Sequence, residues 1–349
     1  MRSQYWDGWK GVCILVVIAL HAIPPPQTFP AGSLKWYVDV ISSQLIVFPV
    51  AIFFAIAGFF SLGRSSGSRC EHGMDYYKRR SARILPPYLI WTGAFILLEH
   101  RSHLLSMKEL SKDLLLGTGI GIGYFVIVLA QFVLVTPVLA KLNDARMHII
   151  LMAALFGCGL LVTYVARVGY PHSELAQFPF YCLSFVVWYP FYHFGLFAAK
   201  FEIAEKNGLR RSRTWVFLLY FFFLAASVAE GIYLCRRSYY SLGVSQLKAT
   251  SLLASSALFV LLLAYHRVTP GAISTNRTIQ LLGKSSYMIY LMHLLALHRV
   301  AILLKEFPLI YVHPFRYALS SFAFTSIVCV LAAVLVNNLH PRVGRLLGA

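Results

Sequence analysis

Lys10 and His21 are the first residues whose types and spacing suggest chemistry. Eleven positions are nearly a whole number of turns at about 3.6 residues per turn, so one helix carries both side chains on one face. At about 1.5 Å per residue they lie roughly 16 Å apart along the axis. If residues 9–24 span a membrane, Lys10 lies at the water boundary and His21 lies deep in the apolar layer. A histidine there is a functional candidate; the alternative is a structural hydrogen bond to a neighbouring helix.

Arg80 and Arg83 form a second candidate site at the start of another apolar segment. Residues three apart share a helical face, and two guanidinium groups that close favour an anion between them, because each can bind two phosphate oxygens at once. With Lys10 at the same predicted membrane face, the three cations would form one anion-binding mouth. The alternative is that both arginines are ordinary basic residues at the inner end of a membrane helix.

The composition indicates that a membrane protein positions these residues. Hydrophobic residues make up 58% of the 349 positions, the mean hydropathy is +0.68, and only 13% of residues are charged, where soluble domains have about a quarter. The net charge of +18 is therefore assigned to lysines and arginines that flank the membrane, and we expect lipids but no nucleic acid as partners. The six cysteines lack C-x-x-C spacing, so we expect no disulfide framework and no metal site.

The hydrophobic segments predict an all-α fold, a polytopic bundle of about ten transmembrane helices. Residues 1–349 are expected to form a single integral-membrane domain with no appended soluble domain. With the N-terminus inside, about twenty of the 31 lysines and arginines fall on the inner side, so both termini are expected in the cytoplasm. The predicted segments are 9–24, 44–62, 83–100, 119–140, 147–166, 180–199, 214–234, 250–266, 279–298 and 317–338.

Other polar residues within the apolar segments are weaker candidates. Glu230 lies near the outer end of its segment and has a histidine or Arg236 as possible partner, while Tyr287 and His293 fall in one late segment, where structural packing is the alternative. Neither H-E-x-x-H nor G-x-S-x-G occurs in the chain, so zinc peptidase and elbow-serine hydrolase chemistry are not supported. The glycines at 117, 119, 121 and 123 are interpreted as a loop or as close helix packing.

Four stretches, in this order, resemble the membrane-bound acyltransferase family 3, whose members modify bacterial surface polysaccharides. The first resembles the family's Arg and His eleven residues apart, and the others resemble its F-F-x-x-S-G-F, R-x-x-R-I-x-P and G-x-x-S-Y-x-x-Y-L-x-H segments. They are Asp7-Gly8-Trp9-Lys10-Gly11 leading to His21, then residues 53–60, 80–86 and 283–293.

The resemblance implies an O-acetyltransferase of the bacterial cytoplasmic (inner) membrane. Acyl-CoA, with acetyl-CoA as the expected co-substrate, would dock from the cytoplasm with its phosphates on Lys10, Arg80 and Arg83. His21 would act as general base on a sugar hydroxyl or be transiently acylated itself, with Glu230, Tyr287 and His293 in possible supporting roles. The acceptor would be a lipid-linked or exported glycan, such as O-antigen lipopolysaccharide, capsule or exopolysaccharide.

The chain departs from the family pattern at two positions. Lys10 replaces the family's Arg, which keeps the charge but loses the bidentate fork, and Ala57 replaces a Ser. The appended extracytoplasmic domain that many members carry is not expected here. The alternative function is a proton-coupled transporter or flippase of a lipid-linked glycan, with His21 and Glu230 as proton carriers.

Overall fold

A computed structural model describes residues 3–62, 74–266 and 272–349, and every regular element in these ranges is a helix. Nine of the described helical stretches are long and apolar enough to cross a membrane, and Ala249–Tyr265 is a shorter apolar helix. The predicted polytopic helix bundle is therefore confirmed, with each predicted segment overlapping one of these stretches. Arg64 and Arg69, which contribute to the predicted inner charge, lie outside the described residues.

The chain folds into two compact units, and each has its own set of packed helices. The first takes its described residues from Met1–Pro24, Gly73–Ala130 and Pro270–Ala349. Its helices, with the first turns of α6 (Tyr124–Lys141), are α1 (Gln4–Ala22), α4 (Met74–Glu99), α5 (Met107–Leu115), α14 (Ala272–Thr275), α15 (Arg277–Lys284), α16 (Ser286–Leu304), α17 (Pro308–Tyr311), α18 (Pro314–Asn337) and α19 (Pro341–Leu347). The single domain expected over the whole chain stays a prediction.

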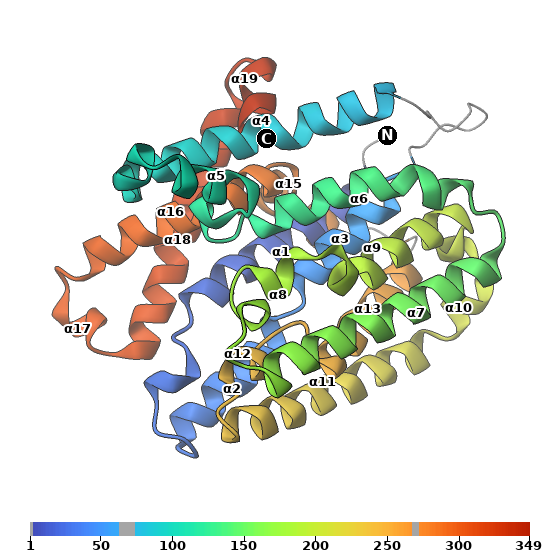
Figure 1. The fold of residues 1–349 in the computed structure, drawn as a ribbon, viewed down its shortest axis with the longest axis horizontal. Helices are drawn as coiled ribbons and strands as arrows, with labels where there is room; N and C mark the ends of the chain where they lie inside the picture. Colours follow the sequence, from blue (N-terminus) through green and yellow to red (C-terminus); the bar gives the residue numbers. More distant parts are fainter. Residues whose placement is uncertain (1–2, 63–73, 267–271) are drawn as a thin grey trace. The chain divides into compact units, whose positions relative to one another are not determined.

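Helix α1 is the centre of the first unit and packs against α15, α16 and α18 (Figure 1). It also packs against the short helix α14. Its apolar side chains Ile14, Val17 and Ile18 are buried, as expected for a helix surrounded by others. The glycine-rich stretch after α5 is a tight loop: Gly117 and Gly121 have φ of 74° and 75°, a backbone conformation that glycine adopts without steric cost. The interpretation of these glycines as a loop is confirmed.

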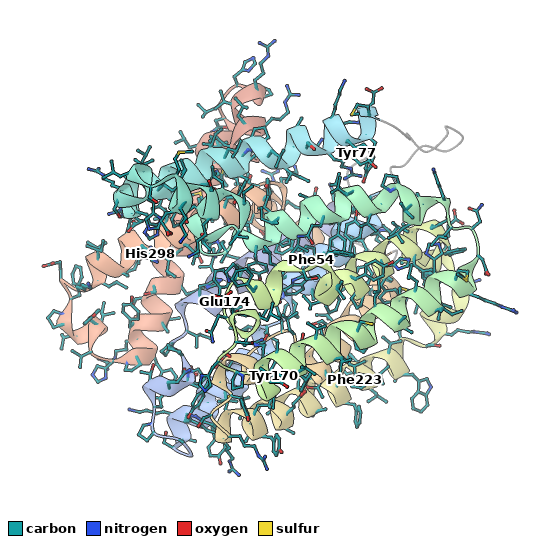
Figure 2. The ribbon with its side chains drawn as sticks, in the orientation of Figure 1. Phe54, Tyr77, Tyr170, Glu174, Phe223 and His298 are labelled. Carbon is teal, nitrogen blue, oxygen red and sulfur yellow. The ribbon has the colours of Figure 1, made fainter. Side chains whose placement is uncertain are left out.

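The second unit takes its described residues from Pro25–His72 and Gln131–Thr269. Its main helix pairs are α3 with α9 and α11 with α13. Phe54, labelled in Figure 2, belongs to its core. Its ring centroid lies 5.5 Å from that of Phe132 and 5.2 Å from that of Trp188. Besides the rest of α6, its helices are α2 (Leu34–Ile46), α3 (Pro49–Phe59), α7 (Ala145–Tyr164), α8 (Phe180–Leu183), α9 (Phe185–Lys200), α10 (Asn207–Arg211), α11 (Arg213–Arg236), α12 (Tyr240–Gly243) and α13 (Ala249–Tyr265).

Two predicted segments differ from the observed helices in their boundaries. The segment predicted at 44–62 belongs to an apolar stretch that begins at Leu34 and is broken before Pro49, which occupies the first turn of α3; proline there needs no N–H partner. The segment predicted at 279–298 is divided at Ser285 into the amphipathic helix α15 and the longer helix α16. Mean hydropathy alone does not reveal either break.

Candidate functional site

Lys10 and His21 lie on one uninterrupted helix, α1, as predicted. The helix begins at Gln4, so Lys10 lies in its second turn and His21 in its last turn. The helix starts earlier than the predicted segment 9–24 because residues Gln4–Asp7 continue it. The expected depths of Lys10 and His21 in the membrane stay a prediction.

Lys10 forms an ion pair with Asp7, whose carboxylate Oδ1 lies 2.6 Å from the lysine Nζ. The Asp7 side chain is 4% exposed and that of Lys10 is 23% exposed. A buried carboxylate requires such a partner, because an unpaired buried charge costs on the order of several kcal/mol of folding free energy. Lys10 therefore has a structural role here, whatever else it binds.

Glycines allow close helix packing between two of the four stretches that resemble the family. A Cβ atom on Gly11 would lie 2.1 Å from the carbonyl oxygen of Ile279 in α15, and one on Gly283 would lie 1.7 Å from the carbonyl oxygen of Asp7. Either clash would force α1 and α15 apart. The first and last stretches are thus in direct contact, and the glycines hold Asp7 and Lys10 against α15.

A hydrogen bond joins the last stretch to the arginine stretch. The Tyr287 hydroxyl of α16 donates to the carbonyl oxygen of Ile84 in α4 at 2.7 Å, directly after Arg83. Pro87 has no N–H, so the Arg83 carbonyl lacks its usual helical hydrogen bond. The Tyr287 contact ties α16 to α4 at the neighbouring residue. Three of the four stretches therefore belong to one packed arrangement within the first unit.

The two arginines of α4 differ in their surroundings. Arg80 is half-buried and places its guanidinium 5.7 Å from the centroid of the Tyr76 ring, a distance at which the cation and the ring attract. Arg83 is exposed one turn further along. The exposed guanidinium keeps its donors available to an anionic ligand.

His21 and His293 are brought together, with ring centroids 5.3 Å apart. His21 is exposed, whereas His293 is completely buried in α16. The His293 Nδ1 lies 2.8 Å from the carbonyl oxygen of Tyr290 and 3.2 Å from that of Ile289. A carbonyl only accepts, so Nδ1 carries the hydrogen, and Nε2 of the neutral ring presents a lone pair. This buried Nε2 has no hydrogen-bond partner among the described atoms.

The remaining candidate, Glu230, lies in the second unit. It accepts hydrogen bonds from the Tyr164 hydroxyl, the Thr250 hydroxyl and the Thr250 backbone N–H, the last at 3.1 Å. These contacts join α7, α11 and α13. The arrangement is that of a carboxylate that ties helices together, and Arg236, one of its expected partners, instead donates to the Tyr37 hydroxyl.

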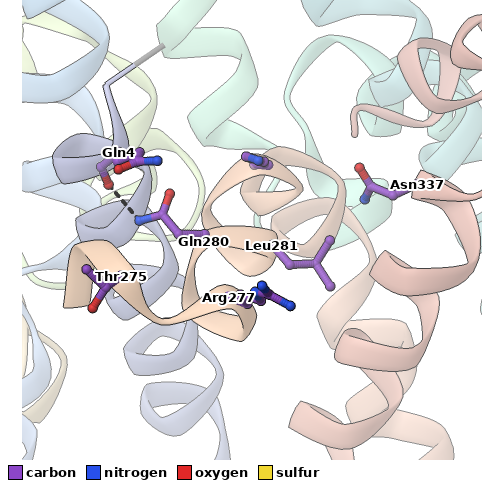
Figure 3. A pocket seen from close by; sticks show the side chains of 7 residues that line it. Gln4, Thr275, Arg277, Gln280, Leu281 and Asn337 are labelled. Carbon is purple, nitrogen blue, oxygen red and sulfur yellow. Dashed lines mark hydrogen bonds between the residues drawn. The ribbon is translucent and has the colours of Figure 1, made fainter. Parts of the chain in front are cut away.

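The sequence did not single out the polar residues around α15. A pocket of about 550 Å³ lies between α15 and the ends of α1 and α18, and its lining includes Arg277 and Lys284 (Figure 3). The available signal was the amphipathic pattern of 277–284, which hydropathy merged into an apolar segment. The described residues contain no group of three or more His, Cys, Asp or Glu side chains placed to hold a metal ion.

In a comparison with protein families, residues 3–334 match the acyltransferase domain of acyltransferase family 3. Comparisons with curated proteins and with solved structures give no match. The family match covers α1, with His21, and α16, with His293, together with nearly all of α18. The chain therefore belongs to acyltransferase family 3 and is a multi-pass membrane acyltransferase.

Proposed function

We propose that the protein transfers an acetyl group from cytoplasmic acetyl-CoA to a sugar hydroxyl of a lipid-linked or exported bacterial surface polysaccharide. Membership of the acyltransferase family supports acyl transfer. The donor, the acceptor and the location in the bacterial inner membrane follow the family resemblance of residues 7–21, 53–60, 80–86 and 283–293. The family assignment favours this reaction over glycan transport, the other function compatible with the sequence.

The contact between His21 and His293 is the observation that carries the proposal. The exposed His21 ring is the one we assign to the substrates, while the buried His293 ring offers a lone pair beside it. In the proposed substrate complex, an N–H of His21 donates to Nε2 of His293. The opposite ring nitrogen of His21 then has its own lone pair turned away from His293, as a general base or nucleophile requires.

The reaction needs only one proton carrier. In direct transfer, His21 takes the proton from the sugar hydroxyl, the sugar oxygen forms the bond to the acetyl carbon, and the carbon–sulfur bond breaks. The proton then passes from His21 to the departing CoA thiolate. In the two-step route, a ring nitrogen of His21 forms the bond to the acetyl carbon as the carbon–sulfur bond breaks and CoA leaves as the thiolate. The sugar oxygen then bonds to the acetyl carbon as the bond to His21 breaks, and the proton of the sugar hydroxyl passes through His21 to the thiolate. Arg80 and Arg83, with Lys10, bind phosphates of CoA in both routes.

His21→Ala tests the proposal in the host cell. Loss of the base or nucleophile lowers turnover by about 100-fold or more, so mass spectrometry of the surface polysaccharide detects no O-acetyl groups above those of a gene deletion. His172→Ala, an exposed histidine in the second unit, is the matched control and retains acetylation. Both variants must accumulate in the membrane as the unmodified protein does. Full acetylation by His21→Ala contradicts the proposal, and a deletion that stops polysaccharide export instead favours a transporter.

A further inference from the structure

The pocket beside α15 is lined mainly by polar residues and lies entirely within the first unit. Its lining comes from the start of α1, from α14 and α15, and from the end of α18 (Figure 3). Its volume of about 550 Å³ is within the usual range of small-molecule sites. The polar residues that line it are Gln4, Thr275, Arg277, Gln280, Lys284 and Asn337.

Two cations give this pocket its charge. Arg277 and Lys284 are seven residues apart in α15, close to two full turns, so both lie on the pocket-facing side of the helix. The lining contains no Asp or Glu. Arg277 has no side-chain hydrogen bond or ion pair with any described residue. The unengaged guanidinium of Arg277, with the ammonium of Lys284 in the same lining, favours a ligand that carries phosphate.

The amides in the lining add directional contacts. Asn337 donates through Nδ2 to Ser285 Oγ at 2.8 Å and to the Ala333 carbonyl at 2.7 Å, so its Oδ1 remains an acceptor. Gln280 donates to the Gln4 carbonyl oxygen at 2.7 Å, which fixes one wall of the pocket (Figure 3). An amide acceptor beside two cations suits a ligand with both a phosphate and a donor such as a ribose hydroxyl or a purine amino group.

The position of the pocket on α1 indicates the length of the ligand. Gln4 lines the pocket and His21 lies in the last turn of the same helix, about 26 Å further along the axis at about 1.5 Å per residue. A ligand that has its phosphate in the pocket and reacts at His21 must therefore be long, with its charged group and its reactive group at opposite ends. A CoA thioester has this form.

We propose that the pocket binds the 3′-phosphoadenosine end of acyl-CoA, with Arg277 and Lys284 on its 3′-phosphate. The inference rests on the proposed acyl-CoA donor and adds a site to it. CoA carries phosphate in two places, the 3′-phosphate and the diphosphate. The pocket binds the 3′-phosphate, and the arginines of α4, Arg80 and Arg83, bind the diphosphate.

Transfer by the purified full-length protein from three donors tests this site. The donors are acetyl-CoA, 3′-dephospho-acetyl-CoA and S-acetylpantetheine, which has no nucleotide. For Arg277→Gln and Lys284→Gln we expect the KM for acetyl-CoA to rise about 10- to 100-fold, the loss of one charge-assisted hydrogen bond, with kcat unchanged. The variants and the unmodified protein should act equally on S-acetylpantetheine. Arg316→Gln, an exposed arginine on α18, is the matched control and should keep the KM for all donors.

The outcomes separate this proposal from the proposed function. An unchanged KM for acetyl-CoA in both variants overturns the pocket, as does an equal loss with S-acetylpantetheine, which assigns Arg277 and Lys284 to the fold. A rise in KM of the same size for acetyl-CoA and its 3′-dephospho form overturns the assignment to the 3′-phosphate. If the unmodified protein uses no CoA thioester, the proposed function fails and the pocket proposal fails with it.

Discussion

At the residue scale, His21 and His293 have different roles in the proposed reaction. His21 is exposed and His293 is buried with its Nδ1 hydrogen held by the Tyr290 carbonyl. The lone pair that remains on Nε2 is unsatisfied, and an unsatisfied buried acceptor costs about 1–3 kcal/mol. An N–H of His21 in the substrate complex would remove that cost, which makes His293 a positioning residue for His21.

His293→Gln and His293→Leu test this role. Glutamine keeps both an amide donor for the carbonyls and an oxygen acceptor for His21, whereas leucine keeps neither. We expect kcat of His293→Leu to fall about 10- to 100-fold, the loss of an orienting hydrogen bond, and His293→Gln to recover most of it. The KM for acetyl-CoA should change little in either variant. Equal losses of kcat in both variants, with unchanged thermal unfolding, would assign His293 to packing alone.

The sequence predicted the shared helix of Lys10 and His21 because eleven residues and helical periodicity are enough for that inference. The ion pair of Lys10 with Asp7 was also within reach, since residues three apart on a helix are neighbours. The ring contact of His21 with His293 was not, because it joins residues far apart in the chain. Sequence spacing cannot place two helices against each other.

At the element scale, the packing of α1 on α15 positions the site. We predict that Gly11→Ala lowers stability by about 1–3 kcal/mol or more, because the added Cβ would lie 2.1 Å from the Ile279 carbonyl oxygen. Gly93→Ala in α4 is the matched control, since its Cβ meets nothing within 4 Å, and it should stabilise the helix by about 0.5–1 kcal/mol. Thermal unfolding in detergent measures both. The same melting temperature for the two variants would contradict the close packing.

The apolar segments of the sequence predicted the positions of the helices but did not predict where a helix is interrupted. Each predicted segment overlaps an observed apolar helix, because burial in a membrane requires about twenty apolar residues whatever the tertiary packing. The division at Ser285 depends on the packing of α15 on α1 and of α16 on α4, which hydropathy does not report. The pocket beside α15 was missed for that reason.

At the whole-molecule scale, the orientation in the membrane decides which side each substrate reaches. The excess of lysine and arginine predicts that Lys206 is cytoplasmic and that Lys305 is outside. In a background with the exposed Cys158 replaced by Ser, a membrane-impermeant maleimide applied to cells with a permeabilised outer membrane should label Lys305→Cys and spare Lys206→Cys. The opposite labelling pattern would reverse the predicted entry sides of donor and acceptor.

The most direct test of the central claim follows the acetyl group itself. Purified protein is incubated with acetyl-CoA labelled in the acetyl group and with the isolated polysaccharide or its lipid-linked precursor, and the label on the glycan is measured together with the CoA thiol released. For the unmodified protein and for His172→Ala, we predict that the amount of label on the glycan equals the amount of CoA thiol released. For His21→Ala, we predict that transfer is at least about 100-fold slower. Undiminished transfer by His21→Ala, or no transfer of label by the unmodified protein, would contradict the account.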